Sequence, residues 1–499
     1  MGNNFAEILA FALYLVLVLT VGIVFFVKGR KSAGGDKDYF LGGRQMNGWV
    51  AALSAGASDM SAWVLMGLPG SIYLYGMGQV WISVGLLIGT ILAWVFVAPG
   101  LRRFSIKADD AITIPQYLTR RFKVNNPALQ IVSAIIFIVA YCVYAASSIV
   151  ACGDLFNTIF GWDKTVAMVG ATCIILLYTF LGGFNAVCWT DFFQGMLMLA
   201  ALMAAPIVAA FAMNATDFAP MAAVVTPDNY YNILSSGKFD WTSISDILSG
   251  LGWGLGYFGM PHILVRYMSI KSEKEMKKSQ KIGIAWTTII LIMASVVGLV
   301  GHKFVGTYLA EGSQSMIFVT MVRQLFPAFI AGLLLSAILA ASMSTADSQL
   351  LLSTSAFTSD VYKPIFRKKA SDKEILWAGR IMVAVIAVIA LVIAMSPDCK
   401  RIMALVECAW TAFGAAFGPV ILLSLYWKRF TYKGALAGII VGFAVDALWY
   451  AFLSSSTGLY EIIPGFICGA IAAVVVSLID KAPSEEVLKL FEEGKKKTE

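Results

Sequence analysis

Residues 53–63 have the sequence LSAGASDMSAW and lie within an apolar segment, residues 47–67, that is long enough to cross a membrane. Four polar side chains, those of Ser54, Ser58, Asp59 and Ser61, fall within eight residues of this segment. Polar side chains inside a spanning helix are costly, and backbone that leaves the helix there must be buried or line a water-filled cavity. We therefore predict that the helix is interrupted near residues 57–61. The alternative is an intact helix whose polar face packs against neighbouring helices.

A second unusual stretch, residues 247–262, has the sequence ILSGLGWGLGYFGMPH, with five Gly and one Pro in sixteen residues. In a helix interior, each Gly costs about 1 kcal/mol and Pro about 3 kcal/mol relative to Ala. We predict a second interruption between Gly254 and Pro261. Trp253 and Tyr257 are four residues apart and share a helix face. In our interpretation they line a pocket, and in the alternative one they pack in a groove between helices.

The composition of the whole chain indicates an integral membrane protein. Of its 499 residues, 59% are hydrophobic and 13% are charged, whereas soluble domains carry about 25% charged residues. So few charges could not cover a soluble surface, and disorder requires the opposite composition. Thirteen predominantly apolar segments are long enough to span a bilayer: 5–27, 47–67, 76–99, 128–158, 165–184, 190–213, 245–265, 282–305, 327–352, 375–395, 402–427, 434–454 and 460–480.

The placement of Lys and Arg predicts the orientation of the chain. If the N-terminus lies outside the cell, 31 of the 37 basic residues fall in segments predicted to be cytoplasmic and 6 in the others. Basic residues accumulate in the cytoplasmic loops of membrane proteins. We therefore expect an extracytoplasmic N-terminus and a cytoplasmic C-terminus, and we attribute the net charge of +7 to this bias rather than to nucleic-acid binding. The tail is expected to form a short helix at the membrane surface.

The two predicted interruptions lie five spans apart, which is typical of transporters built from inverted repeats. An odd number of helices in each repeat gives the two repeats opposite orientations in the membrane. The predicted divisions are an extra N-terminal helix with the first cytoplasmic loop (1–44), the first repeat (45–213), an extracytoplasmic loop (214–244), the second repeat (245–427), two additional helices (428–480) and a cytoplasmic tail (481–499).

The ninth span supplies oxygen atoms that could hold a sodium ion. Residues 336–348 have the sequence SAILAASMSTADS, in which Ala341, Ser344 and Thr345 share one helix face. Hard cations prefer oxygen ligands, and carbonyls of Ala57 and Met60, released by the first interruption, would bring the number of ligands to five. The alternative is that the two hydroxyls simply bond to backbone carbonyls of their own helix.

Three motifs resemble those of the sodium/solute symporter family: SAGASDMS (54–61) followed by GLPG (67–70), WGLGYFGMPHI (253–263) followed by Arg266, and MSTADSQ (343–349). The similarity runs from the first span to the last. It implies an all-α integral membrane protein with a leucine-transporter-like fold, thirteen transmembrane helices and a five-plus-five inverted repeat. It also implies a symporter of the bacterial cytoplasmic membrane that imports L-proline with Na⁺; the alternative substrate is another small organic solute, such as another amino acid or a carboxylate.

The resemblance also implies roles for individual residues. The five oxygen donors match the Na⁺ ligands of the family, and Asp59 matches one of its important aspartates. Arg44, in the sequence LGGR (41–44), matches the arginine of the first inner loop, and Asp191 matches an acidic residue that we interpret as structural. Met260 and Ala62 depart from the expected pattern near the pocket. The predicted substrate site comprises Tyr144, Trp253, Tyr257 and Pro261, to which we add Ser61.

The remaining polar residues favour a transporter over other classes of membrane protein. Asp347, two residues beyond the hydroxyl pair, is interpreted either as a second cation or proton site or as part of a polar network. With only two His and no CxxC among seven Cys, we expect neither a metal centre nor an enzyme. A channel would want one continuous pore rather than two interrupted helices. We expect Na⁺ as the co-transported ion, lipids as surroundings, and neither nucleic acid nor a protein partner.

Overall fold

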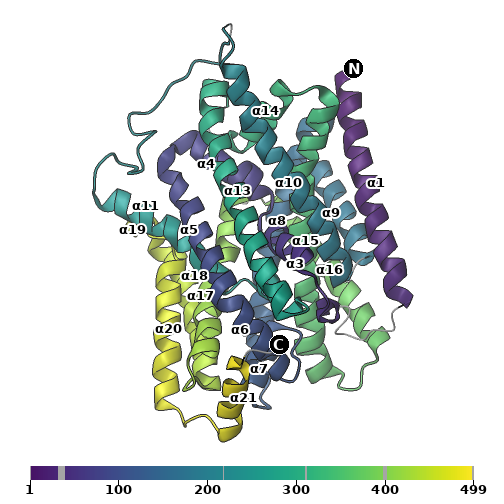
Figure 1. Ribbon diagram of the computed structural model, residues 1–499, viewed down its shortest axis with the longest axis vertical. Coiled ribbons are helices and arrows are strands. Elements are labelled where there is room, and N and C mark those ends of the chain that lie inside the picture. Colours follow the sequence, from purple (N-terminus) through teal and green to yellow (C-terminus); the bar gives the residue numbers. More distant parts are fainter. Residues whose placement is uncertain are drawn as a thin grey trace.

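The computed structural model describes residues 2–31, 40–181, 183–216, 218–309, 312–396 and 402–496. Parts of two predicted loops, residues 32–39 and 397–401, lie outside the described residues. The described chain is helical throughout, without strands, and its helices form one bundle (Figure 1). Helical segments lie within all thirteen predicted ranges.

Ten of the described helices are long and apolar enough to cross a membrane. One of them is a continuous stretch in which α5 (Val80–Leu92) joins α6 (Ala98–Lys107) through a π-helical turn. The others are α1 (Gly2–Lys31), α8 (Ala128–Phe160), α10 (Phe184–Met213), α13 (Glu273–Val305), α15 (Ala328–Ser355), α16 (Asp372–Met395), α17 (Ile402–Tyr426), α18 (Tyr432–Phe452) and α20 (Ile462–Ile479). A shorter apolar helix, α9 (Lys164–Leu181), packs on α8.

The first predicted interruption is confirmed. The helix α3 (Gly48–Asp59) begins at Asn47, whose side chain caps it, and ends before Met60, which has φ −84° and ψ 76°. A π-helical turn, Trp63–Gly67, then leads into α4 (Leu68–Tyr75). The amide of Ser61 bonds to the carbonyl of Asp59 rather than to that of residue 57, as a continuous helix would require. The carbonyl of Ala57 is therefore released from the helix.

The second predicted interruption is also confirmed. The helix α11 (Trp241–Gly252) passes into a 3₁₀ stretch, Trp253–Phe258, in which the backbone winds more tightly. Met260 is extended, and α12 (Pro261–Ser269) then begins with its proline in the first turn. That position suits proline, because the first turn of a helix needs no amide donor.

The glycines of the second interruption have another role that the sequence analysis did not predict. Gly250 and Gly254 lie directly against Gly85 and Gly89 of α5, and each pair has the four-residue spacing of close-packed membrane helices. A Cβ atom on Gly89 would lie 2.2 Å from the carbonyl oxygen of Gly254. The second interruption is therefore held against α5 by contact between backbones.

Replacing Gly89 should therefore damage the fold. We expect Gly89→Ala to destabilise the protein by about 1–3 kcal/mol, because the new methyl group meets backbone that cannot rotate away. Thermal unfolding of the purified protein in detergent measures this effect. The matched control is Gly170→Ala in α9, where an added Cβ meets only a Trp162 ring atom at 3.6 Å. Equal melting temperatures for the two variants would contradict the proposed packing.

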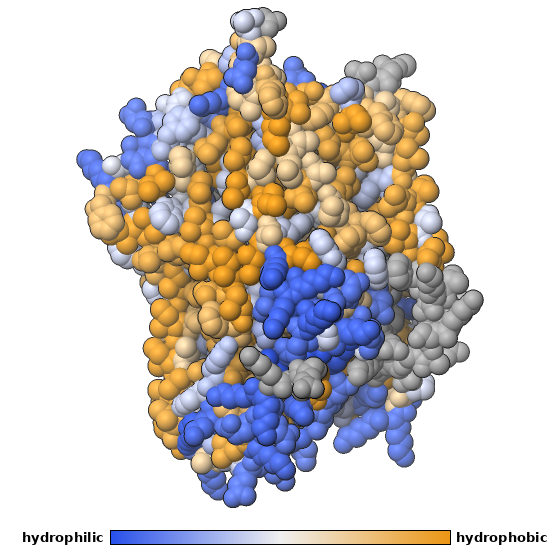
Figure 2. All heavy atoms as spheres, in the orientation of Figure 1, coloured by the Kyte–Doolittle hydropathy of each residue, from blue (hydrophilic) through white to orange (hydrophobic). Residues whose placement is uncertain are grey.

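The molecular surface divides into an apolar part and a hydrophilic end. In Figure 2, apolar residues cover most of the visible surface, and hydrophilic residues gather toward the lower end, where Figure 1 places α6, α7 (Ile114–Arg121) and α21 (Glu485–Lys495). The tail helix α21 does not lie free at a membrane surface as predicted. Its apolar residues Val487, Leu490 and Phe491 are buried against the protein, and the rings of Phe491 and Phe104 lie 5.7 Å apart.

The segments that begin α3 and end α12 are tied together near this lower end. The amide of Met46 donates to the carbonyl of Ser269, and the amide of Lys271 donates to the carbonyl of Met46. Arg102 of α6 adds hydrogen bonds to the carbonyls of Ile270 and Lys271. The two interrupted helices therefore share one junction.

Candidate functional site

The first interruption and α15 bring a group of buried oxygen atoms together. The hydroxyl of Ser344 lies 2.9 Å from the carbonyl oxygen of Ala57 and 3.0 Å from that of Ala341. The hydroxyl of Thr345 is buried and has no hydrogen-bond partner among the described residues. A threonine in a helix commonly bonds to a carbonyl of the preceding turn, so Thr345 departs from the alternative considered for it. Met60 lies at the interruption itself.

Asp59 connects the first interruption to the second. The hydroxyl of Tyr257 donates to Asp59 Oδ2 at 2.6 Å. The backbone carbonyl of Asp59 accepts hydrogen bonds from the hydroxyl of Tyr144 and from the indole of Trp63, both at 3.1 Å. The second carboxylate oxygen, Oδ1, is buried and has no partner among the described residues. Asp59 therefore has one oxygen committed to Tyr257 and one left for another donor.

Aromatic rings surround this carboxylate. The ring of Trp253 lies 6.4 Å from that of Trp63 and 6.2 Å from that of Trp410, between ring centroids. Trp410 also packs edge-on against Tyr257 at 5.2 Å and donates its indole hydrogen to the carbonyl of Trp253. The sequence analysis missed Trp63 and Trp410. Trp63 ends the quoted motif and was a detectable candidate, whereas nothing in the sequence around Trp410 pairs it with residue 253.

The structure places the remaining predicted substrate residues at the edges of the two interruptions. Ser61 and Pro261 are both buried. The hydroxyl of Ser61 accepts a hydrogen bond from the amide of Trp63 at 3.4 Å, and Pro261 begins α12. The two departures from the family pattern, Ala62 and Met260, are also fully buried beside the interruptions.

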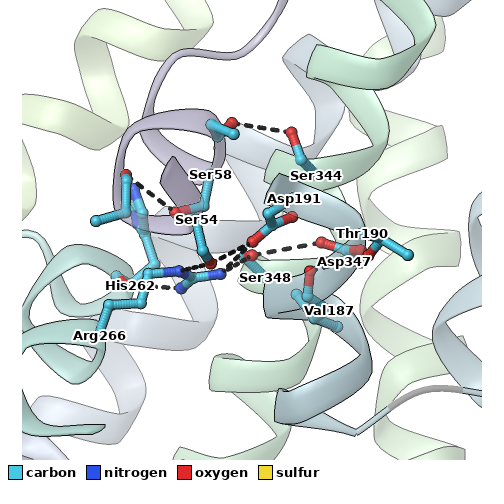
Figure 3. A network of polar contacts seen from close by, with 12 residues as sticks. Ser54, Ser58, Val187, Thr190, Asp191, His262, Arg266, Ser344, Asp347 and Ser348 are labelled. Atoms are coloured by element: carbon cyan, nitrogen blue, oxygen red, sulfur yellow. Dashed lines mark hydrogen bonds and ion pairs between the residues drawn. The ribbon is translucent and has the colours of Figure 1, made fainter. Parts of the chain in front are cut away.

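A network of charged and polar side chains lies beside the oxygen cluster (Figure 3). Arg266 of α12 forms an ion pair with Asp191 of α10 at 2.9 Å, and both side chains are buried. Arg266 also donates to the hydroxyls of Ser54 and Ser348, at 2.7 and 2.6 Å. Ser348 in turn contacts Asp347 Oδ1 at 3.3 Å, while Asp347 Oδ2 has no partner among the described residues. Four helices, α3, α10, α12 and α15, are joined in this way.

The sequence of the chain matches the model of the sodium:solute symporter family over residues 39–442. The chain belongs to the sodium:solute symporter family. It is 44% identical to the osmoregulated proline transporter OpuE of Bacillus subtilis over 489 residues, which is 97% of each protein. It is 41% identical to the sodium/proline symporter of Escherichia coli over 492 residues, 98% of this chain and 96% of the relative. The protein is thus a sodium-coupled transporter and not an enzyme.

Solved structures confirm the class of fold. The symporter superimposes on a Na⁺-coupled sialic acid symporter in a substrate-bound outward-open state with a TM-score of 0.77, over 96% of this chain and 99% of that chain, at 20% identity. A nucleobase-cation-symport-1 family transporter, in a closed conformation with bromovinylhydantoin bound, gives a TM-score of 0.54 at 13% identity and covers 91% of this chain and 98% of that chain. The predicted all-α leucine-transporter-like fold is therefore correct.

The structure places Arg44 of the symporter away from the oxygen cluster. Its guanidinium donates to Asp110 Oδ1 at 2.7 Å, to the hydroxyl of Ser105 at 3.0 Å, and to the carbonyls of Met268 and Ala111. Burial lowers the pKa of Arg44 below its ordinary value, and the neighbouring Asp110 carboxylate opposes this effect. Arg44 thus fastens the end of α12 to the segment between α6 and α7.

The buried ion pair gives a testable expectation for the symporter. Replacing Arg266 by Met should strip the Asp191 carboxylate of its partner and cost about 3–5 kcal/mol of stability, because an uncompensated charge remains inside the protein. The double variant Arg266→Met, Asp191→Asn carries no buried charge at this pair and should recover most of the folded protein. Size-exclusion chromatography of fluorescent fusions compares the three proteins. A double variant that folds no better than Arg266→Met would contradict this account.

Proposed function

We propose that the protein imports L-proline together with Na⁺ by alternating access. The observation that carries this proposal is the Tyr257–Asp59 hydrogen bond, because it joins the two interrupted helices directly beside the oxygen cluster. The relatives whose names include proline match the chain over nearly its whole length. The second candidate is Na⁺-coupled import of another small organic solute, and Met260 and Ala62 are the residues that favour it.

In this proposal the ion binds to oxygen atoms from both interrupted and intact helices. The carbonyls of Ala57, Met60 and Ala341 and the hydroxyls of Ser344 and Thr345 act as the ligands. Three of these oxygens already lie within hydrogen-bond distance of one another, and Thr345 has a hydroxyl without a partner. An all-oxygen set without sulfur or imidazole suits a hard cation such as Na⁺.

The substrate occupies the neighbouring aromatic chamber. The rings of Trp253 and Tyr257 contact the apolar ring of proline, and Tyr144, Ser61 and Pro261 complete the site. The donors exposed where the helices are interrupted receive the carboxylate. Asp59, Arg44 and Asp347 act in coupling rather than as direct ligands. Asp59 does so between the ion and the substrate, while the other two belong to contacts that hold α12 in place.

The proposed topology has thirteen crossings of the bacterial cytoplasmic membrane. The N-terminus is outside and the C-terminus in the cytoplasm, with surrounding lipids in contact with the apolar surface. The first five-helix repeat spans 45–213 and the second 245–427, in opposite orientations. The extra segments are 1–44 before the repeats, the loop 214–244 between them, and 428–480 and 481–499 after them. Accessibility of single cysteines introduced into the loops to a membrane-impermeant reagent tests this arrangement.

Uptake of labelled proline into membrane vesicles tests the main proposal. With an inward Na⁺ gradient, proline should accumulate above equilibrium, and with K⁺ or choline in place of Na⁺ it should not. Competition by other unlabelled solutes separates the two candidate functions, since only a true substrate or a close analogue displaces proline. Accumulation of proline without dependence on Na⁺ would contradict the proposed mechanism.

Tyr257 allows the ring contact and the hydrogen bond to be separated. Tyr257→Phe keeps the ring but removes the hydroxyl that bonds to Asp59, and Tyr257→Ala removes both. We expect the Ala variant to weaken proline binding by about 10- to 100-fold, typical of a lost aromatic contact, and the Phe variant to retain more of it. Na⁺ binding without proline should stay close to wild type in both. Direct binding of labelled proline and of ²²Na⁺ to purified protein measures the two effects.

A further inference from the structure

A second cavity lies on the other side of Trp253 from Asp59. Its volume is 210 Å³ and its walls come from the start of α5, from α11, from α17 and from the segment 454–461 that precedes α20. In Figure 1, α11 and the short helix α19 (Ser454–Thr457) lie together at one side of the bundle, where the indole of Trp241 bonds to the carbonyl of Thr457. In the proposed topology this cavity faces the outside of the cell.

Three carboxylates line this outer cavity: Asp246, Glu407 and Glu461. None of them forms an ion pair with a Lys or Arg among the described residues. Glu461 is only 2% exposed, and its Oε1 atom has no hydrogen-bond partner in the described structure. Its other oxygen receives one long contact, 3.5 Å, from the hydroxyl of Ser454. A buried carboxylate in this state is costly unless a cation compensates it.

The shape of the outer cavity favours an organic cation over a metal ion. Na⁺ and divalent metals need several ligands converging on one point, and no three His, Cys, Asp or Glu side chains in the described residues are arranged to hold a metal. Instead, an aromatic wall faces the carboxylates, since Trp253 and Tyr460 stack at 5.1 Å between centroids. The hydroxyl of Tyr460, a residue only 4% exposed, also has no partner among the described residues. Ring faces beside carboxylates are the surroundings that ammonium groups prefer.

We propose that the outer cavity is a binding site for small organic ammonium ions, where an incoming substrate is held before it reaches the central chamber. Its outward direction and its link to transport rest on the proposed function. Trp253 forms part of both the cavity and the aromatic chamber, so a substrate bound by its ammonium group at Glu461 and Glu407 lies one ring away from Asp59. The carboxylate of the substrate is not needed for binding here.

Binding of pyrrolidinium, the ring ammonium of proline without its carboxylate, tests the proposal. Saturation-transfer NMR on the purified full-length protein, in K⁺ buffer without Na⁺, should show saturable binding to wild type. Glu461→Gln and Glu407→Gln should each weaken it about tenfold, as expected when one charge-assisted contact is lost. The matched control, Asp228→Asn, replaces an exposed carboxylate of the loop 214–244 and should change nothing. Glu461→Asp should restore part of the affinity.

The outcomes separate this proposal from the central site. Tyr257→Ala should abolish tight proline binding while leaving pyrrolidinium binding intact. Pyrrolidinium binding that survives both Gln variants, or is absent from the wild type, would overturn the proposed cavity site. Displacement of pyrrolidinium by Na⁺ but not by K⁺ would mean that the cavity is a metal site, which also overturns it. If pyrrolidinium binds as expected but proline uptake proves independent of Na⁺, the proposed transport function fails and the cavity site stands.

Discussion

Thr345→Ala is expected to raise the Na⁺ concentration for half-maximal proline uptake by about 10- to 150-fold. The substitution removes one oxygen from the proposed ion site, and contacts to charged groups are worth about 1.5–3 kcal/mol. Because the Thr345 hydroxyl has no hydrogen-bond partner among the described residues, its loss breaks no contact within the protein. The amount and the melting temperature of the folded protein should therefore change little.

Two further variants of α15 make this result specific. Thr345→Ser keeps the hydroxyl and should stay within a few-fold of wild type. Thr354→Ala is the matched control, because Thr354 is also buried in α15 and its hydroxyl likewise has no partner in the described structure, but it lies more than two turns further along the helix. Unchanged Na⁺ dependence in Thr345→Ala would show that the ion site has been misplaced.

The second large effect concerns Asp59. Asp59→Asn is expected to abolish nearly all Na⁺-driven uptake, because it removes the negative charge between the ion and the substrate and places a donor group opposite the hydroxyl of Tyr257. Asp59→Glu keeps the charge and should retain part of the activity. The matched control is Asp446→Asn on α18, a buried aspartate that accepts from Thr411 outside the two repeats. Equal uptake by Asp59→Asn and wild type would exclude a role for the charge.

The same two sites predict how ion and substrate influence each other. The Ala57 carbonyl and Asp59 belong to one short segment, so Na⁺ should fix the form of that segment that proline needs. Linkage requires each ligand to tighten the other by the same factor, about 5- to 150-fold for a coupling of 1–3 kcal/mol. A Na⁺ titration of proline binding to purified protein measures this factor, with K⁺ as the replacement ion. Proline affinity that does not vary with Na⁺ would refute the shared-segment mechanism.

Local sequence was sufficient to predict where the helices are interrupted. Polar residues at 54–61 and the Gly and Pro content of 247–262 act within one or two turns, so their effects could be read without knowledge of neighbouring helices. The helix-face spacing of Ser344 and Thr345 is equally local. These expectations agree with the interruptions at Met60 and at Met260.

Contacts between distant segments could not be predicted in the same way. The ion pair of Arg266 with Asp191 and the position of Trp410 against Trp253 depend on how helices 75 and 157 residues apart pack together. Arg266 was counted as a loop residue because positive charge is expected outside the membrane, whereas a buried carboxylate allows it inside. The tail helix was placed at a membrane surface because its apolar face fits lipid as well as it fits the ring of Phe104.

The junction between Met46 and the segment 269–271 is built from main-chain amides and carbonyls alone. Substitution scanning with alanine would leave all of its donors and acceptors in place, so such a scan would pass over it. The same property shields it from evolutionary drift, since neutral replacements on either strand preserve the pairing. Among the ordinary amino acids, only proline at position 46 or 271 would delete a donor. The pivot that couples the two interrupted helices is therefore inherited through chain geometry rather than through side-chain identity.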